Sequence, residues 1–363
     1  MSSDEKKLLN RAFDSNWIAP IGPQIDSFED EVSDYINIKS SCALSSGTAA
    51  LHLAVKILGI SKNDFVLCPS LTFSATANVI MYENANPIFI DSDPKHWTFD
   101  ISILERAILK YKPKAIITVD LYGQSCDYDT LIDICKKYNV HVIEDAAEAM
   151  GSTYKGKKLG SFGSVGVLSF NGNKIITTSG GGMLLSQNEE YIKKAKFLST
   201  QSREPSLHYE HKELGYNYRM SNLLASIGRG QLKRLDKFVE IKRNIFNRYK
   251  KYLSIYDGID FLEEHKHSYS NRWLTTLKIN ERKIGVAPND IIKILSSENI
   301  ESRPVWKPMH MQPFYKNNIF IKKGVKDVSR SLFEKGLCLP SGSNLSIKEQ
   351  DRIIDIIISQ IRK

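Results

Sequence analysis

Short apolar runs alternate with amphipathic stretches through the first two thirds of this chain, and this alternation constrains the fold more than any other feature. The apolar runs predict strands at Phe65–Cys68, Ile88–Ile90, Ala115–Val119, Val140–Ile143, Val165–Phe170 and Met183–Leu185. The stretches between them predict helices at Ala49–Leu58, Ser74–Tyr82, Ile101–Lys110, Tyr128–Tyr138 and Glu190–Leu198. This alternation is typical of an α/β fold in which right-handed crossovers build a largely parallel sheet covered by helices. Because ligands bind beyond the carboxyl ends of such strands, functional residues are expected there.

The pattern changes in the last third of the chain. A polar, amphipathic stretch from Ser221 to Tyr252 has helical spacing and predicts one long helix that bridges two domains. Mixed strand and helix patterns follow, and they end in an amphipathic helix at Ile347–Ile361. We therefore expect a large domain, residues 1–235, and a smaller C-terminal α/β domain, residues 236–363.

The 363-residue chain carries 50 Lys and Arg against 41 Asp and Glu, a formal net charge of +9. A basic protein attracts anionic partners, but lysines dispersed in this way also suit a surface that binds nothing. No helix-turn-helix, zinc-finger or RNA-recognition motif accompanies the charge, so nucleic acid is not an expected partner. No apolar run approaches the ~20 residues that cross a bilayer, and the N-terminus has no secretory signal. We expect a cytoplasmic protein without a membrane partner.

The five cysteines predict neither disulfides nor a metal centre. They are Cys42, Cys68, Cys126, Cys135 and Cys338. None of them forms a Cys-x-x-Cys pair, and no histidine cluster has the spacing of metal ligands. Free, buried thiols in a reducing compartment are the expectation, with no metal.

The segment Ser45-Ser46-Gly47-Thr48 stands at the start of the first predicted helix, directly after an apolar run. Ser and Thr are good N-caps, Gly47 permits close approach of the backbone, and the first N–H groups of a helix have no partners. Such a helix start binds phosphate, although an ordinary capped helix has the same pattern. The spacing matches neither a P-loop nor a dinucleotide-binding fingerprint.

Two further segments carry groups that suit chemistry. The apolar run that begins at Val142 leads into Asp145 and Glu148, where a carboxylate can hold a cationic ring nitrogen or a metal, or can cap a helix. Lys174 follows an Asn-Gly pair and precedes three glycines. Asn-Gly is a strong hairpin signal that would leave Lys174 exposed beyond the turn. Alternatively, Lys174 is a lysine that bonds covalently to a carbonyl, with Ser169 nearby as a phosphate ligand.

The three segments together favour a single interpretation. A phosphate-binding helix start, an aspartate at a strand end and a lysine among small residues are the parts that pyridoxal phosphate requires. Its phosphate needs donors, its ring nitrogen needs a carboxylate to stay protonated, and its aldehyde needs an amine.

At these residues the sequence resembles the fold-type-I sugar-nucleotide aminotransferases of the DegT/StrS class. The resemblance runs nearly end to end, and its most specific parts are the segments 169–182 and 302–310. It implies a large domain with a mostly parallel seven-stranded sheet. Within the class, the two segments look most like the 4-aminotransferase of the UDP-N-acetylbacillosamine pathway. That enzyme moves the amino group of L-glutamate to C4 of a UDP-2-acetamido-2,6-dideoxy-hexulose, giving a UDP-4-amino-4,6-dideoxy-N-acetylhexosamine for surface glycans.

The resemblance implies roles for residues around pyridoxal 5′-phosphate. Lys174 bonds to the cofactor's aldehyde, and Asp145 pairs with its ring nitrogen. Phe73 stacks on the ring, and Glu148 lies beside the cofactor at a position where many relatives carry Gln or His.

The cofactor phosphate is assigned in the same way. The resemblance implies that Gly47, Thr48 and Ser169 hold it. Asn217 matches the residue that reaches the phosphate of the neighbouring subunit, which implies a homodimer with shared active sites.

Substrate positions also follow from the resemblance. It implies that two segments contact the nucleotide sugar: Asn16, Trp17, Ile18 and Ala19; and Trp306, Lys307, Pro308, Met309 and His310. Simple packing is an even alternative for the two tryptophans. Arg219 suits the donor's carboxylate, although a structural salt bridge is the favoured interpretation. Asp120 stands where His is frequent in the class.

Other activities stay open on the sequence alone. An aminotransferase for GDP-4-keto-6-deoxymannose or a dTDP-keto-sugar has the same parts. Sugar dehydratases of this fold carry His in place of the lysine, so Lys174 argues against them. A non-catalytic nucleotide-sugar binding protein with the same fold is the alternative from another functional class.

Overall fold

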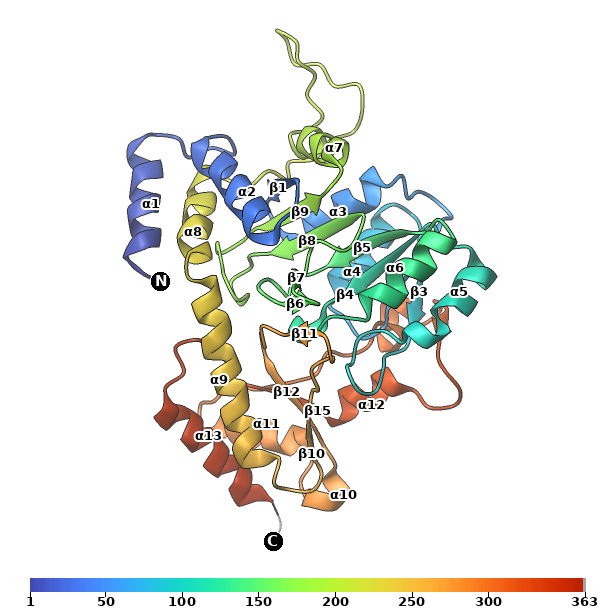
Figure 1. Cartoon of the computed structure of the whole chain (residues 1–363), viewed down its shortest axis with the longest axis vertical. Helices are drawn as coiled ribbons and strands as arrows, with labels where there is room; N and C mark the ends of the chain where they lie inside the picture. Colours follow the sequence, from blue (N-terminus) through green and yellow to red (C-terminus); the bar gives the residue numbers. More distant parts are fainter. Residues whose placement is uncertain (362–363) are drawn as a thin grey trace.

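Eight strands form the central sheet of the computed structural model, which describes residues 1–361 (Figure 1). Their order is β1-β9-β8-β5-β4-β2-β3-β14. Their bounds are β1 Ser40–Leu44, β2 Phe65–Pro69, β3 Asn86–Ile90, β4 Ala115–Val119, β5 His141–Asp145, β8 Val165–Ser169, β9 Gly182–Ser186 and β14 Phe320–Ile321. Neighbouring strands from β8 to β14 in this order are parallel, whereas β9 runs antiparallel to both β8 and β1. The expected α/β fold with a mostly parallel sheet is confirmed.

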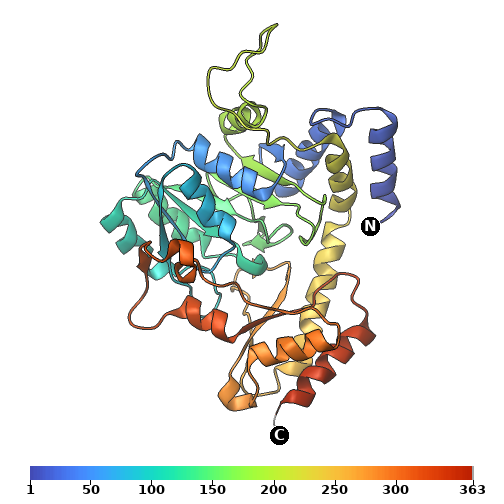
Figure 2. The same ribbon diagram turned by 180° about the vertical axis from the view of Figure 1, so that it is seen from behind.

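Helices cover both faces of this sheet (Figures 1 and 2). One face packs against α3 (Gly47–Ile57), α4 (Ser74–Tyr82) and α7 (Glu189–Ser199), and the other against α2 (Pro23–Ile36), α5 (Leu104–Tyr111) and α6 (Tyr128–Lys137). Successive strand residues point to opposite faces, so Leu67 and Ile116 join one core cluster while Val66 and Ile117 join the other. The complete burial of β4 follows from this double cover.

The predicted elements of the first two thirds are present, and their strand ends differ from the prediction by at most two residues. The helix expected from Ile101 is divided, because a 3-10 turn, η1 (Ile101–Ile103), precedes α5. The sheet has eight strands instead of the expected seven, because β14 returns from the last third of the chain and pairs with β3. Its two residues are too few for a sequence pattern to reveal.

The single helix expected from Ser221 to Tyr252 is wrong. The segment forms α8 (Asn222–Leu232) and α9 (Leu235–Leu253), and Arg234 between them has non-helical backbone angles of φ −112° and ψ 2°. Helix α8 packs closely on α2 and on α1 (Ser3–Asp14). A Cβ at Gly228 would lie 2.5 Å from the ring of Phe28, and one at Gly230 would lie 2.8 Å from the backbone of Glu5. The break lets α8 keep this contact while α9 runs away toward the C-terminal part of the chain (Figure 1).

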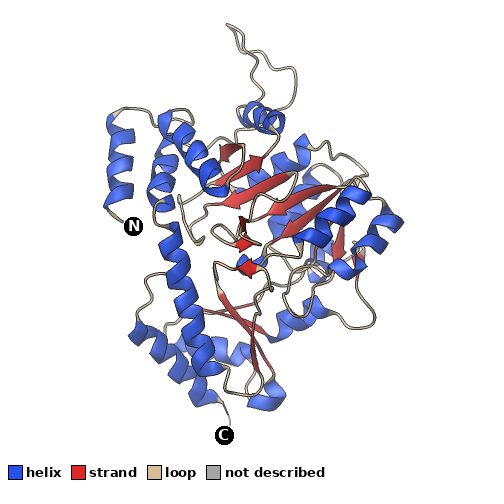
Figure 3. Cartoon of the chain, in the orientation of Figure 1, coloured by secondary structure: helices blue, strands red, loops and turns tan. Residues whose placement is uncertain are grey.

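The C-terminal part has its own sheet and core (Figure 3). Its strand order is β10-β12-β15-β13, with bounds β10 Ile259–Phe261, β12 Thr275–Ile279, β15 Gly336–Leu339 and β13 Arg303–Pro304. Its helices are α9, α10 (Glu281–Ile284), α11 (Pro288–Ser297), α12 (Val328–Lys335) and α13 (Ile347–Gln360). A third, small sheet of β11 (Ser268–Tyr269), β6 (Thr153–Tyr154) and β7 (Lys157–Lys158) joins the two parts. The division at residue 235 stays a prediction.

Candidate active site

The start of α3 lies against the end of β8, so two of the predicted phosphate ligands meet. A Cβ added to Gly47 would lie 3.0 Å from Cβ and 3.2 Å from Oγ of Ser169. Ser46 is the N-cap, and its hydroxyl accepts a hydrogen bond of 3.0 Å from the amide of Ala49. The capped helix and the phosphate cradle are therefore one structure. Its first turn, with Gly47 and Thr48, presents N–H groups at the positive end of the helix dipole, which suits a phosphate.

Asp145 ends β5 and is buried. Its carboxylate accepts hydrogen bonds from the hydroxyl of Thr76 in α4 at 2.9 Å and from the amide of Ala147 at 3.2 Å. Burial raises the pKa of Asp145 above its ordinary value, and these hydrogen bonds and the charge of Lys174 oppose the rise. A cation placed against the carboxylate would stabilise its charged form.

Lys174 points inward from the loop that joins β8 and β9. These strands form the hairpin that the Asn-Gly signal indicates, with Ser169 opposite Gly182, but the loop between them spans residues 170–181. The side chain of Lys174 is only 12% exposed, and its Nζ lies 3.7 Å from Oε1 of Glu148. The alternative in which Lys174 is exposed beyond a tight turn is wrong, because the wide loop turns the side chain back over the strand ends.

Glu148 is held beside Lys174 from two sides. Its Oε2 accepts a hydrogen bond of 2.7 Å from the amide of Tyr122, and its backbone carbonyl accepts one of 2.9 Å from the side chain of Asn271. Tyr122 adopts a left-handed conformation, φ 54° and ψ 25°, which aims its amide at the carboxylate. Burial raises the pKa of Glu148, and the charge of Lys174 lowers it. Lys174, Asp145 and Glu148 thus form one group of ionisable side chains.

Trp273 completes this group, although sequence reasoning missed it. Its ring centroid lies 4.2 Å from Nζ of Lys174, and its Nε1 donates a hydrogen bond of 2.8 Å to the carbonyl of Asn173. Thr76 and Tyr122 were missed as well. No motif marks these residues, because each lies far along the chain from Lys174 and only the fold brings them together.

Phe73 and Trp306 lie together near Tyr122. Phe73 is 50% exposed at the start of α4, and its ring meets that of Trp306 edge to face with centroids 4.8 Å apart. The amide of Trp306 donates a hydrogen bond of 3.2 Å to the hydroxyl of Tyr122. An exposed aromatic ring at this place can stack on a planar ligand.

The rest of the segment 306–310 is anchored to the large sheet. Lys307 is exposed, whereas Pro308 and Met309 are buried. His310 uses both ring nitrogens internally, with Nδ1 2.6 Å from Oγ of Ser70 and Nε2 3.0 Å from Asp327. Its ring also stacks on Phe320 at 3.8 Å. His310 therefore holds the segment 306–310 in place and would affect a ligand only in that way.

The structure places the remaining predicted residues elsewhere. Asn16, Trp17, Ile18 and Ala19 are exposed, and the carbonyls of Trp17 and Ala19 bond to Asn222 at the start of α8. Asn217 lines a groove of about 780 Å³ whose lining includes neither Lys174, Asp145 nor Glu148. Its neighbour Arg219 pairs with Glu29 and donates to the carbonyl of Ala43 at 3.0 Å, in agreement with the structural ion pair.

Asp120 lies behind Asp145 and is completely buried. Its Oδ1 accepts a hydrogen bond of 2.8 Å from Tyr128, its Oδ2 has no partner, and its amide donates to the carbonyl of Asp145. Burial and the neighbouring Glu144 raise the pKa of Asp120 well above its usual range. Its burial therefore favours the neutral form of the carboxyl.

Within residues 1–361, no helix is long and apolar enough to cross a membrane. The same residues contain no group of three or more His, Cys, Asp or Glu that could hold a metal ion.

Comparison with known proteins agrees with this geometry. Residues 1–358 match the model of the DegT/DnrJ/EryC1/StrS aminotransferase family. A putative pyridoxal phosphate-dependent aminotransferase, EpsN of Bacillus subtilis, is 50% identical over 99% of this chain and 93% of its own length. GDP-perosamine synthase of Caulobacter vibrioides is 36% identical over 98% of this chain and 94% of its own length. The PLP form of the putative sugar aminotransferase Spr1654 of Streptococcus pneumoniae superposes with a TM-score of 0.90 at 28% identity, covering 100% of this chain and 98% of that one.

Proposed function

The chain belongs to the DegT/DnrJ/EryC1/StrS aminotransferase family, and from this premise we propose that it aminates C4 of a UDP-2-acetamido-2,6-dideoxy-hexulose with L-glutamate as donor. Its membership makes it a pyridoxal phosphate-dependent sugar aminotransferase. The observation that carries the proposal is Lys174, whose side chain is only 12% exposed and whose Nζ lies 3.7 Å from Glu148, in the same group as Asp145. The UDP-linked sugar rests on the resemblance of segments 169–182 and 302–310.

The residues present fit pyridoxal phosphate. Gly47 approaches Ser169 too closely for a side chain, and the first-turn N–H groups of α3, which begins with Gly47 and Thr48, suit a phosphate. Asp145, with its raised pKa, gains a counter-charge from a protonated ring nitrogen. Phe73 supplies an exposed ring for stacking. When bound, the cofactor supplies an aldehyde that bonds to amines and a ring that accepts the electron pair left on a carbon after proton loss.

Lys174 has two tasks in this proposal. Its amine holds the cofactor between turnovers, and it then moves one proton between the reacting carbon atoms of each half-reaction. Asp145 keeps the ring nitrogen charged, and Glu148 stays beside Lys174 as its ion-pair partner. Lys174→Ala should abolish turnover, and a variant with the wild-type rate would refute the assignment.

The nucleotide sugar is proposed to lie over Trp306 and Lys307. The exposed Lys307 offers a cation to the diphosphate, and Trp306 offers an aromatic edge beside Phe73. Met309 and Pro308 are buried, so they shape the segment rather than reach into solvent. Nucleotide sugars are expected in the cytoplasm, where we place the reaction.

A homodimer with shared sites is part of the proposal. Asn217 is exposed on a groove that is bordered by the arm 203–209, which projects from the body of the molecule (Figure 1). Leu207 and Tyr209 on this arm are exposed apolar side chains. The segment Asn16–Ala19 adds Trp17 and Ile18, which are also half-exposed. If a second copy of the chain covers these side chains, Asn217 of one copy would reach the cofactor phosphate that the other copy binds.

Complementation tests the shared site. Lys174→Ala and Asn217→Ala chains are each expected to be inactive or weak as homodimers. When refolded together they should regain activity, because a mixed dimer has one site with both native residues. Activity that stays at the level of the two separate variants, in protein that light scattering shows to be dimeric, would contradict the shared site.

A GDP-linked sugar is the second candidate, and the relative named GDP-perosamine synthase favours it. The discriminating experiment incubates the enzyme and L-glutamate with UDP-, GDP- and dTDP-linked 4-keto-6-deoxy sugars, and identifies products by mass and NMR. Amination of the UDP-2-acetamido sugar alone supports the proposal, whereas a preference for GDP-4-keto-6-deoxymannose supports the alternative. Protein that gains no yellow absorbance after addition of the cofactor would instead support a non-catalytic binding protein.

A further inference from the structure

Trp273 is the largest side chain in contact with the amine of Lys174, and nothing in the proposed function uses it. It is 1% exposed, and its ring face lies 4.2 Å from Nζ of Lys174. Glu148 is the second neighbour of this amine, with its Oε1 3.7 Å from the same Nζ. We define this place between the ring and the carboxylate as the resting position of Lys174.

Every polar group of Trp273 is held. Its amide donates to Oδ1 of Asn271 at 2.9 Å, its carbonyl accepts from Nζ of Lys242 at 3.0 Å, and its Nε1 donates to the carbonyl of Asn173. The ring also stacks on Tyr122 with centroids 6.2 Å apart and an interplanar angle of 18°. A ring fixed by so many contacts offers a preorganised surface to whatever lies against it.

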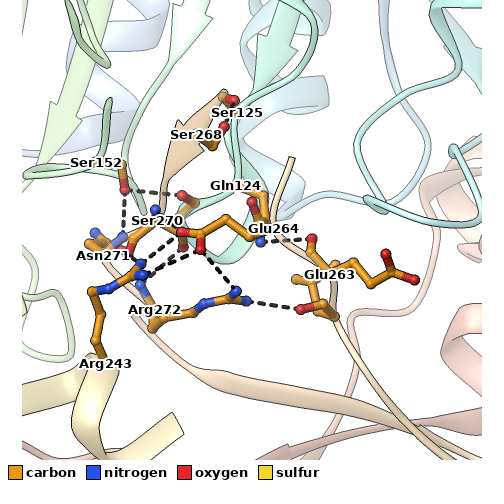
Figure 4. A network of polar contacts seen from close by, with 12 residues as sticks. Gln124, Ser125, Ser152, Arg243, Glu263, Glu264, Ser268, Ser270, Asn271 and Arg272 are labelled. Carbon is orange, nitrogen blue, oxygen red and sulfur yellow. Dashed lines mark hydrogen bonds and ion pairs between the residues drawn. The ribbon is translucent and has the colours of Figure 1, made fainter. Parts of the chain in front are cut away.

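The backbone before Trp273 belongs to a polar network that joins the two parts of the chain (Figure 4). The hydroxyl of Ser152 accepts from the amide of Asn271 at 2.8 Å and donates to the carbonyl of Gly123 at 3.0 Å. The side chain of Asn271 donates to the carbonyls of Glu148 and Met150. Asn271 therefore fixes the relative positions of Glu148 and Trp273, the two residues on either side of the resting position.

Arg272 keeps the turn before Trp273 in place. It has φ 50°, in the left-handed region, and its guanidinium lies 3.8 Å above the ring of Phe246 and donates to the carbonyl of Leu262 at 2.9 Å. Figure 4 shows it beside Glu264, which Arg243 of helix α9 also binds, at 2.7 Å. The orientation of Trp273 thus depends on helix α9 and on the loop before β12.

Both contacts of the resting position favour a positive charge on Nζ. An aromatic face attracts an ammonium through its quadrupole, and a carboxylate attracts it by charge. The ionisable groups that face Lys174 are Glu148 and, at longer range, Asp145. A lysine that removes a proton from carbon becomes an ammonium, so groups that stabilise the ammonium assist that step.

We propose that Trp273 is a further catalytic residue, whose indole face, with Glu148, stabilises the ammonium form of Lys174 once Lys174 has taken up a proton. This inference rests on the proposed function of Lys174 and adds the group that stabilises its protonated form. Lys242 and Asn271 are positioning residues for Trp273.

The first test measures the pH dependence of cofactor capture, without any sugar. Apoprotein is mixed with pyridoxal phosphate over a pH series, the absorbance of the bound cofactor is followed, and borohydride reduction with peptide mass analysis confirms Lys174 as the site. Attack on an aldehyde needs the neutral amine, and loss of Trp273 weakens the ammonium. The pH midpoint for Trp273→Leu should therefore fall by about 0.4 to 1.5 pH units, with Trp273→Phe between it and the wild type.

Trp97→Leu is the matched control. Trp97 is also 1% exposed and also contacts Tyr122, with ring centroids 6.5 Å apart, so its loss costs similar packing. Its midpoint should equal that of the wild type. A Trp273→Leu midpoint equal to the wild type, or an equal shift in Trp97→Leu, overturns the proposal.

The second test needs no cofactor. It can still decide the proposal in the case that Trp273→Leu fails to fold. Tryptophan fluorescence of the apoprotein is compared with that of Lys174→Met, in the wild-type, Trp273→Phe and Trp97→Phe backgrounds. The difference should be lost in Trp273→Phe and kept in Trp97→Phe, whereas a difference that persists in Trp273→Phe overturns the contact. A wild-type protein that captures no cofactor at any pH would refute the proposed function, and the fluorescence comparison would still decide the role of Trp273.

Discussion

Replacing Lys242 with methionine should change how the stability of the protein depends on pH. Lys242 lies in α9 and is 7% exposed. Its Nζ donates to the carbonyls of Trp273 at 3.0 Å and Ser341 at 2.7 Å. No carboxylate within residues 1–361 forms an ion pair with it. The ammonium is therefore buried with two carbonyl acceptors and no counter-charge.

The magnitude follows from this burial. Loss of solvation lowers the pKa of Lys242 from its ordinary 10.5 to about 8. At 1.36 kcal/mol per pKa unit, this difference costs the folded state about 3 kcal/mol. The cost is present in full below the folded pKa of about 8, and it disappears as the pH rises toward the unfolded value of 10.5. The neutral amine keeps enough N–H groups for both carbonyls, so the clamp on Trp273 survives deprotonation.

The assay is chemical denaturation of wild type and Lys242→Met over a pH series in the alkaline range. Other titrating groups are common to both proteins and cancel in the difference. The free energy of unfolding of the wild type should rise relative to the variant by about 3 kcal/mol between about pH 7 and pH 11. Lys250→Met, an exposed lysine on the same helix, is the control and should follow the wild type. Curves for wild type and Lys242→Met that stay parallel would refute the reasoning.

Three further predictions concern the site. Asp120→Asn should be at least as stable as the wild type at pH 7.5. Burial and Glu144 raise the pKa of Asp120, so the folded wild-type protein loses stability as the pH rises above about 4, and denaturation at about pH 4 and at pH 7.5 checks this. Gly47→Ala should weaken cofactor binding roughly tenfold or more, because its Cβ would lie 3.0 Å from Ser169; equilibrium dialysis measures it, and Gly172→Ala, with 3.9 Å to its nearest neighbour, should bind normally. His310→Phe should raise the KM for the nucleotide sugar about tenfold through loss of two hydrogen bonds, while a slower glutamate half-reaction would contradict a role confined to the sugar segment.

Local patterns in the sequence predicted most of the large sheet. The expected strand Ala115–Val119 and the expected helix Ser74–Tyr82 agree with β4 and α4 to the residue. Strand β4 is buried on both faces and is therefore marked by a short, mainly apolar run. The break between α8 and α9 left no such signal, because it is set by the fit of Gly228 and Gly230 against other helices.

The order of apolar and amphipathic runs was enough to predict the fold class. It also marked Lys174, Asp145, Gly47 and Ser169 as candidate site residues, because each stands beside a strand end or helix start that its neighbours encode. The three-dimensional arrangement was needed to show that Lys174 turns inward, with its side chain 12% exposed, instead of lying exposed beyond a turn. It was also needed to show that Glu148 and Trp273 lie beside its amine and that Tyr122 holds Glu148. Trp273 reaches Lys174 from the C-terminal part of the chain, through hydrogen bonds with Asn271 and Lys242. Contacts of this kind join segments that are far apart along the chain, and residue order carries no periodic trace of them.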